Sequence, residues 1–146
     1  MTPSLIPFKP EHNGGLVNRD DGQVNDEDQA MLIAKATAGP AYTMVLGEAI
    51  VGAGGVIVTH PGVGYAWLNL TEVVGRYGIW LTKVVAGVLR EAIDGHDLHR
   101  IEAAVVGNYD TNQRWLERFG FVFEGVSRQF TSERIDALRF AWVRED

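Results

Sequence analysis

The sequence contains no cysteine among its 146 residues. This absence excludes disulfides, thiolate metal sites and a cysteine nucleophile, and it fits a reducing compartment, so we expect a cytoplasmic protein. Long hydrophobic runs are also missing, because no apolar stretch approaches the roughly 20 residues that cross a bilayer. The N-terminus lacks a basic flank followed by an apolar run. We therefore expect neither a membrane span nor an export signal.

Basic side chains are comparatively few: 13 Lys and Arg stand against 19 Asp and Glu, which gives a formal charge of −6. This charge repels phosphate backbones and anionic lipid, so neither nucleic acid nor a membrane is an expected partner, and a cationic ligand is favoured. The hydrophobic share of 46% suffices for one continuous core. We expect a single domain over residues 1–146, in which residues 1–23 combine one short extended piece with turn chemistry.

Hydrophobic periodicity and turn residues predict an ordered series of elements. The series is a helix between Asp26 and Gly39, strands at Tyr42–Leu46, Ala49–Val58 and Val63–Leu70, a helix at Ile79–Ile93, a strand at Ile101–Val106, a short helix from Asp110 to Gly120, and a closing hairpin of Phe121–Phe130 and Ile135–Val143. Gly87 lies inside the long helix, where it predicts close packing. The order indicates an α/β (α+β) fold with a mixed, mostly antiparallel sheet of six to seven strands and helices on both faces.

The most specific pattern runs from Asn108 to Phe121. It resembles the second acetyl-coenzyme A motif of the GCN5-related N-acetyltransferases (GNAT), in which Asn-x-x-Ser/Thr/Ala begins a helix that ends Glu-Lys/Arg-x-Gly-Phe. The residues in register are Asn108, Thr111, Glu117, Arg118, Gly120 and Phe121. The flanking strands and the element order from about Tyr42 onward are also similar, especially to the ribosomal-protein acetyltransferases. The resemblance implies the acyl-CoA N-acyltransferase fold, with acetyl-CoA as co-substrate, no metal, and a protein or small-molecule amine as acceptor.

In this family the pyrophosphate of the cofactor binds the loop before the long helix. Gly75, Arg76 and Gly78 stand in that loop here, in a degraded form of the family pattern. Glycines let backbone N–H groups approach an anion at a helix N-terminus, and an arginine adds a charge-assisted contact. The alternative is an ordinary turn with a solvated arginine. The resemblance adds Asn108 and Thr111 to the expected cofactor-binding residues.

The family binds the acetyl group where its fourth and fifth strands part. The resemblance implies that a backbone N–H of Leu68, Asn69 or Leu70 holds the acetyl carbonyl, so that the amine attacks the thioester directly in a ternary complex. Leu116 replaces the tyrosine that often protonates the departing thiolate, which leaves Tyr109, Tyr77 or water as the proton source.

The amine must also lose a proton, and four side chains are candidates for the base: Glu72, Glu102, Glu48 and His60. Burial of Glu102 on its strand would raise the pKa of its carboxyl and suit it to this role. The alternative for each candidate is a surface residue or, for Glu102, pairing with an arginine.

Other features have simpler explanations. The glycine spacing of Gly52–Gly55 is similar to that of a dinucleotide-binding loop, but a strand continues after it where such a loop requires a helix. His96 and His99 have metal-like spacing, yet a polar loop accounts for them. Trp67 is expected in the core, with the acceptor channel as the alternative.

The resemblance leaves more than one function open. A homodimer is compatible with it. Short divergent domains of this kind also occur in tailed bacteriophages, so the alternative function is a virion-associated or host-interaction module without turnover.

Overall fold

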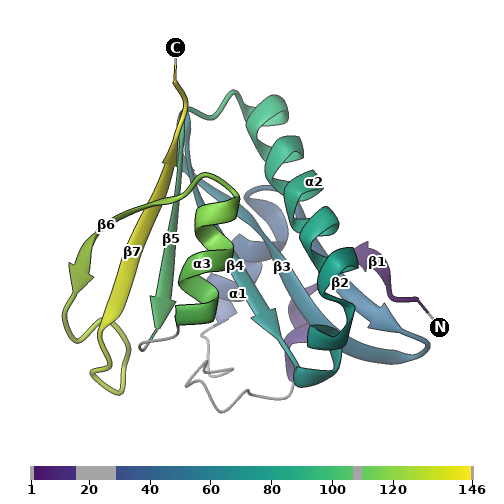
Figure 1. Cartoon of the computed structure of the whole chain (residues 1–146). Helices are drawn as coiled ribbons and strands as arrows, with labels where there is room; N and C mark the ends of the chain where they lie inside the picture. Colours follow the sequence, from purple (N-terminus) through teal and green to yellow (C-terminus); the bar gives the residue numbers. More distant parts are fainter. Residues whose placement is uncertain (1, 16–28, 107–109, 146) are drawn as a thin grey trace.

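The computed structural model describes residues 2–15, 29–106 and 110–145, which form three α-helices and one seven-stranded sheet (Figure 1). From α1 onward the helices and strands follow the predicted order, and β1, η1 and η2 are additional to it. Their bounds are β1 Ser4–Pro7, η1 Pro10–Gly15, α1 Gln29–Thr37, β2 Ala41–Leu46, β3 Ala49–His60, β4 Val63–Leu70, η2 Glu72–Tyr77, α2 Gly78–His96, β5 Arg100–Val106, α3 Asp110–Arg118, β6 Val122–Ser127 and β7 Ala137–Val143.

The sheet has the strand order β1-β2-β3-β4-β5-β7-β6. Neighbouring strands are antiparallel throughout, except that β4 and β5 are parallel. This one parallel pair follows from connectivity, because α2 carries the chain back across the sheet between β4 and β5. The expected mixed, mostly antiparallel α+β architecture is confirmed.

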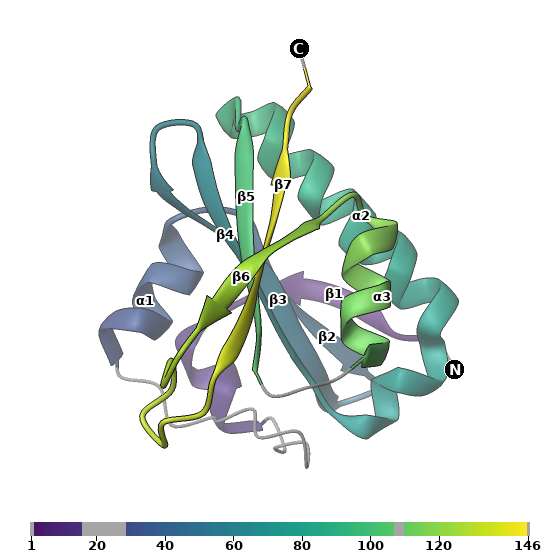
Figure 2. The same ribbon diagram turned by 60° about the vertical axis from the view of Figure 1, so that its left-hand side comes forward.

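The helices cover the two faces of the sheet unequally (Figure 2). On one face, α1 packs through Leu32 against Phe8, Ile57 and Trp67. On the other face, α2 and α3 share the larger part of the core, in which Leu98, Ile101 and Phe140 are almost completely buried. Leu98 is 0% exposed. Because side chains alternate along a strand, β4 sends Trp67 toward α1 and Leu68 toward α2.

Several predicted ends shift by a few residues. The long helix continues through His96 and ends at Asp97, whose φ of 49° is left-handed. The closing hairpin has shorter strands than expected, since its tip bends through left-handed Gln129 and Arg134. Gly120 ends the α3 segment with φ 89°, as expected of a helix-ending glycine.

The prediction of close packing at Gly87 is wrong. Gly87 is exposed, and a Cβ added there would meet no atom within 4 Å, so no close packing explains this glycine. The Gly52–Gly55 segment lies inside β3, as its strand interpretation required. Among the described residues, no helix is both long and apolar enough to span a membrane.

Candidate functional site

β4 and β5 are joined at one end only. Their pairing is limited to Val63 with Arg100, Gly64 with Ile101, and Tyr65 with Glu102. Beyond Tyr65 the strands part, and Figure 1 shows β4 and β5 diverging, with α3 in front of the opening. Each strand nevertheless stays fully paired with its other neighbour, β4 with β3 and β5 with β7. The opening therefore costs only the missing β4–β5 bonds.

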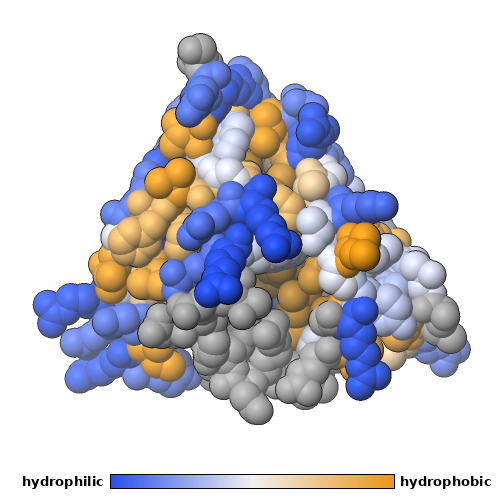
Figure 3. All heavy atoms as spheres, viewed as in Figure 1, coloured by the Kyte–Doolittle hydropathy of each residue, from blue (hydrophilic) through white to orange (hydrophobic). Residues whose placement is uncertain are grey.

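A cleft of about 1260 Å³ occupies this opening. Its walls come from the parted segments of β4 and β5, from α2 and α3 on one side, and from α1 and the tip of the β6–β7 hairpin on the other. The cleft thus reaches both faces of the sheet. Figure 3 shows apolar residues in the hollow beside α3, which itself carries strongly hydrophilic residues.

The backbone of β4 faces this cleft at every second residue. The N–H of Thr71 donates to the Val51 carbonyl on β3 at 3.0 Å. Because this orientation alternates along a strand, the N–H groups of Asn69 and Trp67 also point to β3, whereas those of Leu70 and Leu68 point toward β5. Of the three predicted carbonyl-binding positions, Leu68 and Leu70 therefore aim a backbone donor into the cleft, and Asn69 presents its side chain instead.

The predicted pyrophosphate loop lies where β4 leads into α2. Glu72, Gly75 and Arg76 fall in η2, and Arg76 is exposed. Gly78 begins the 19-residue α2 and lines the cleft, and a Cβ added to it would meet no atom within 4 Å. A helix N-terminus with open space beside it suits an anion, since its free N–H groups carry about half a positive charge. Gly78 therefore suits the anionic part of the expected cofactor, whereas Gly75 and Arg76 precede it in η2, and Arg76 is not among the described residues that line the cleft.

The other cofactor residues of the sequence prediction fall near α3. Thr111 is in its first turn, while Asn108 and Tyr109 lie outside the described residues. Leu116 lines the cleft, so an apolar side chain stands where the family often has a tyrosine. Tyr77, its possible substitute, precedes α2.

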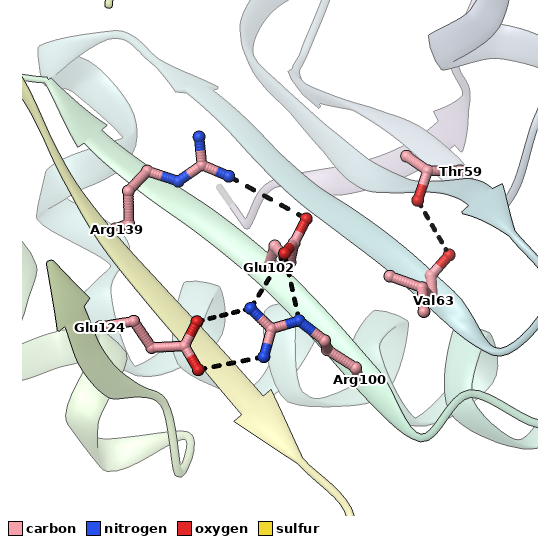
Figure 4. Close-up of polar contacts among 6 residues, drawn as sticks. All are labelled: Thr59, Val63, Arg100, Glu102, Glu124 and Arg139. Carbon is pink, nitrogen blue, oxygen red and sulfur yellow. Dashed lines mark hydrogen bonds and ion pairs between the residues drawn. The ribbon is translucent and has the colours of Figure 1, made fainter. Parts of the chain in front are cut away.

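Glu102 belongs to a charged cluster on the α1 face of β5 (Figure 4). Arg100 donates to Glu102 Oε2 through Nε at 3.1 Å and Nη2 at 2.9 Å, and the same guanidinium binds both oxygens of Glu124. The pKa of Glu124 is lowered, chiefly by this hydrogen bond from Arg100. Arg139 lies 4.0 Å from Glu102 on its other side. Glu102 is therefore a paired, partly exposed carboxylate and not a core side chain.

The remaining candidate bases lie at the ends of β3. His60 is exposed beside Val63, at the joined end of the β4–β5 pair, and Glu48 is exposed in the β2–β3 turn. Neither of them lines the cleft, and Glu102 does not line it either, although Glu102 is paired to Tyr65 at the point where the strands begin to part.

The charge of the cleft is opposite in sign to that of the chain. Its charged lining residues, among those that the structure describes, are Lys35, Arg114, Arg118, Arg139 and Glu133. Four cations against one acid favour anionic or electron-rich ligands, although the chain as a whole carries −6. Net charge is therefore a poor guide to what this site binds.

Two buried N–H donors in the cleft wall have no acceptor within the described part of the chain. They are Nε1 of Trp67 and Nδ2 of Asn69, which share the α1 face of β4. Trp67 is only 8% exposed, and its ring contacts Phe8 and lies 4.4 Å from Lys35 Nζ. Sequence reasoning overlooked both as hydrogen-bond donors. Strand alternation puts them on one face, but only burial reveals that they lack acceptors.

Comparisons with known proteins agree with this geometry. Neither a family profile nor a curated protein sequence matches the chain. Solved structures do match. Ard1 from Thermoplasma volcanium has a TM-score of 0.73 and 13% sequence identity, with 100% of each chain covered. A GNAT-family acetyltransferase from Streptococcus pneumoniae has a TM-score of 0.61 and 14% identity, with 98% of this chain and 100% of that chain covered. An acetyltransferase from Bacillus subtilis in complex with CoA also matches, with a TM-score of 0.64, 14% identity, and 82% of this chain and 86% of that chain covered.

At these identities the likeness establishes the fold. The chain has the GNAT acyltransferase fold over nearly its whole length, as the resemblance of the Asn108–Phe121 pattern predicted.

Proposed function

We propose that this protein is an acetyl-CoA-dependent N-acetyltransferase that acts on a primary amine. The observation that carries the proposal is the parting of β4 and β5 after Tyr65, which opens a large cleft beside the N-terminus of α2. A parallel pair closed along its length would leave no room for a thioester. The CoA complex of the Bacillus subtilis acetyltransferase, which shares the fold, supports the same assignment.

The reaction that fits this cleft is a direct transfer. The amine nitrogen attacks the thioester carbonyl carbon, the carbon–sulfur bond breaks, and the thiolate leaves with a proton. The Leu68 N–H, or that of Leu70, donates to the carbonyl oxygen as negative charge develops on it. Gly75, Arg76 and Gly78 bind the pyrophosphate at the α2 N-terminus, and Asn108 and Thr111 complete the cofactor site.

The transfer also needs a base for the amine and an acid for the thiolate. Glu72 begins η2, two residues after the last residue of β4, and is one candidate base. Glu102 would act only through water, because Arg100 already occupies its carboxylate. Tyr109 is the candidate acid for the thiolate. Since CoA thiolate is a good leaving group, water can replace this acid at a modest cost in rate.

Calorimetry with acetyl-CoA tests the proposal. Micromolar binding, followed by release of free thiol when an amine is added, is expected. The thiol assay has no background from the protein, because the chain contains no cysteine. Absence of binding at millimolar acetyl-CoA would contradict the proposal and favour a non-enzymatic interaction module.

A further inference from the structure

The two unpartnered donors of β4 flank Leu68, one of the two residues whose N–H is proposed to hold the acetyl group. Trp67 and Asn69 stand immediately before and after Leu68, and their side chains lie on the α1 side of the strand. Successive residues of a strand are about 3.3 Å apart, so both side chains start within one residue of the reacting carbonyl. Whatever satisfies these donors therefore binds next to the reaction centre.

Leaving such donors empty is costly. A buried N–H without an acceptor forfeits the hydrogen bond that it makes to water in the unfolded chain, and native proteins rarely tolerate this. Trp67 Nε1 can only donate, so its partner must offer an oxygen or another lone pair. The cationic lining of the cleft also favours an electron-rich group.

The amine of the acceptor cannot meet this need. Its single lone pair attacks the thioester, and a protonated amine offers no lone pair at all. A polyamine therefore leaves both donors empty, and a lysine side chain places its nearest carbonyl oxygen several bonds away. An α-amino acyl group, by contrast, carries an oxygen three bonds from the nitrogen.

We propose, on the basis of the acetyltransferase function above, that the acceptor is an α-amino acyl group whose oxygen accepts hydrogen bonds from Trp67 Nε1 and Asn69 Nδ2. The shared chemistry is a carbonyl or carboxylate oxygen next to an α-amine. A free amino acid and the first residue of a peptide both provide it.

A panel of acceptors tests this substrate class at fixed acetyl-CoA. The panel is a free amino acid, its amide, a dipeptide, Nα-acetyl-lysine and spermidine. We expect kcat/KM for the first three to exceed that for the last two by at least about tenfold. The ranking of free amino acid against amide and dipeptide tells whether the oxygen belongs to a carboxylate or to a peptide carbonyl. Equal or better turnover of spermidine or Nα-acetyl-lysine would overturn the proposal.

Two variants test the donors themselves. Trp67→Phe keeps an aromatic ring beside Lys35 but removes the N–H, and Asn69→Asp keeps the shape but removes the amide donors. Each should raise KM for the α-amino acceptor about tenfold and leave the acetyl-CoA dissociation constant unchanged. Trp142→Phe is the matched control, because Trp142 packs in the core and is not part of the cleft wall.

The outcomes separate the two proposals. If the wild-type protein fails to bind acetyl-CoA, the proposed function fails. If it binds acetyl-CoA and releases thiol, but both variants retain the wild-type KM, the acetyltransferase function stands and the role of Trp67 and Asn69 is overturned.

Discussion

The two ends of the β4–β5 pair differ although they belong to the same two strands. At the joined end, three residue pairs connect the strands, and the N–H groups of His99 and Arg100 add bonds to the Gly62 carbonyl. Leu98, 0% exposed, packs beneath Gly64, where an added Cβ would lie 3.2 Å from its Cδ1. At the open end, no residue pair joins the strands and the cleft takes their place. One end provides stability, and the other provides room for chemistry.

The difference between the two ends shows how a sheet can open between two strands and still keep its pairing on either side. Because β4 is paired with β3 and β5 with β7 over their whole lengths, each half-sheet is complete without the other. The joined end and the helices α2 and α3 hold the halves together. We therefore expect mutations at the joined end to affect unfolding, and mutations at the open end to affect binding and rate.

The largest effect should come from the joined end. Leu98→Ala should lower the free energy of unfolding by about 2–5 kcal/mol, because it removes most of a fully buried side chain and leaves a cavity. Urea unfolding measures this change. Ile79→Ala, at the start of α2, is the control, since Ile79 is 77% exposed and its loss should be nearly neutral. Equal losses of unfolding free energy for the two variants would contradict the assignment of stability to the joined end.

Substitutions at the open end should lower the catalytic rate. Leu68→Pro removes the N–H that points into the cleft and leaves the β3 side of the ladder unbroken. We expect kcat to fall by about 10²–10³, the usual effect of losing one oxyanion donor. Leu68→Ala keeps this N–H and is the matched control. A folded Leu68→Pro protein with normal kcat would remove Leu68 from the reaction.

A smaller effect is expected at the α2 N-terminus. Arg76→Gln should raise the acetyl-CoA dissociation constant about fivefold, since an exposed charge-assisted contact contributes about 1 kcal/mol. Calorimetry at low and high salt checks this, and the difference should shrink as salt screens the charge. Arg90→Gln is the control, because Arg90 is an exposed arginine within α2, far along the helix from its N-terminus and outside the cleft wall. A similar loss for both variants would indicate a general charge effect.

The smallest effect concerns the charged cluster. Arg100 lowers the pKa of Glu124, so the pair stabilises the fold above the ordinary carboxyl pKa of about 4.3, and this contribution is lost as the pH falls through the lowered value. Glu124 is 39% exposed, and solvent screening limits the contribution to below about 1 kcal/mol. Glu124→Gln should therefore differ slightly from wild type in urea unfolding at pH 7 and not at all at strongly acid pH. A difference that grows in acid would contradict this sign.

Much of the fold could be predicted because its signals are local. Alternation over Val63–Leu70, the apolar stripe of α2 and the cap at Gly120 each depend on residues close in sequence. The prediction for Gly87 was wrong because a glycine can be tolerated on an exposed helix face as well as required in a tight one. The site was harder to predict, because the charged cluster joins residues that are distant in sequence. Glu102 is linked through Arg100 to Glu124, 22 positions away, and it pairs directly with Arg139, 37 positions away.

The sequence alone determined the order of the elements and the resemblance of Asn108–Phe121, because helix periods, strand alternation and caps act over a few residues. The resemblance also implied that β4 and β5 part. Only the tertiary structure decided that they part after Tyr65, that the cleft is cationic in an acidic chain, and that the donors of Trp67 and Asn69 have no acceptor among the described residues. These properties depend on which distant surfaces are brought together and closed off from water, and no local pattern specifies that.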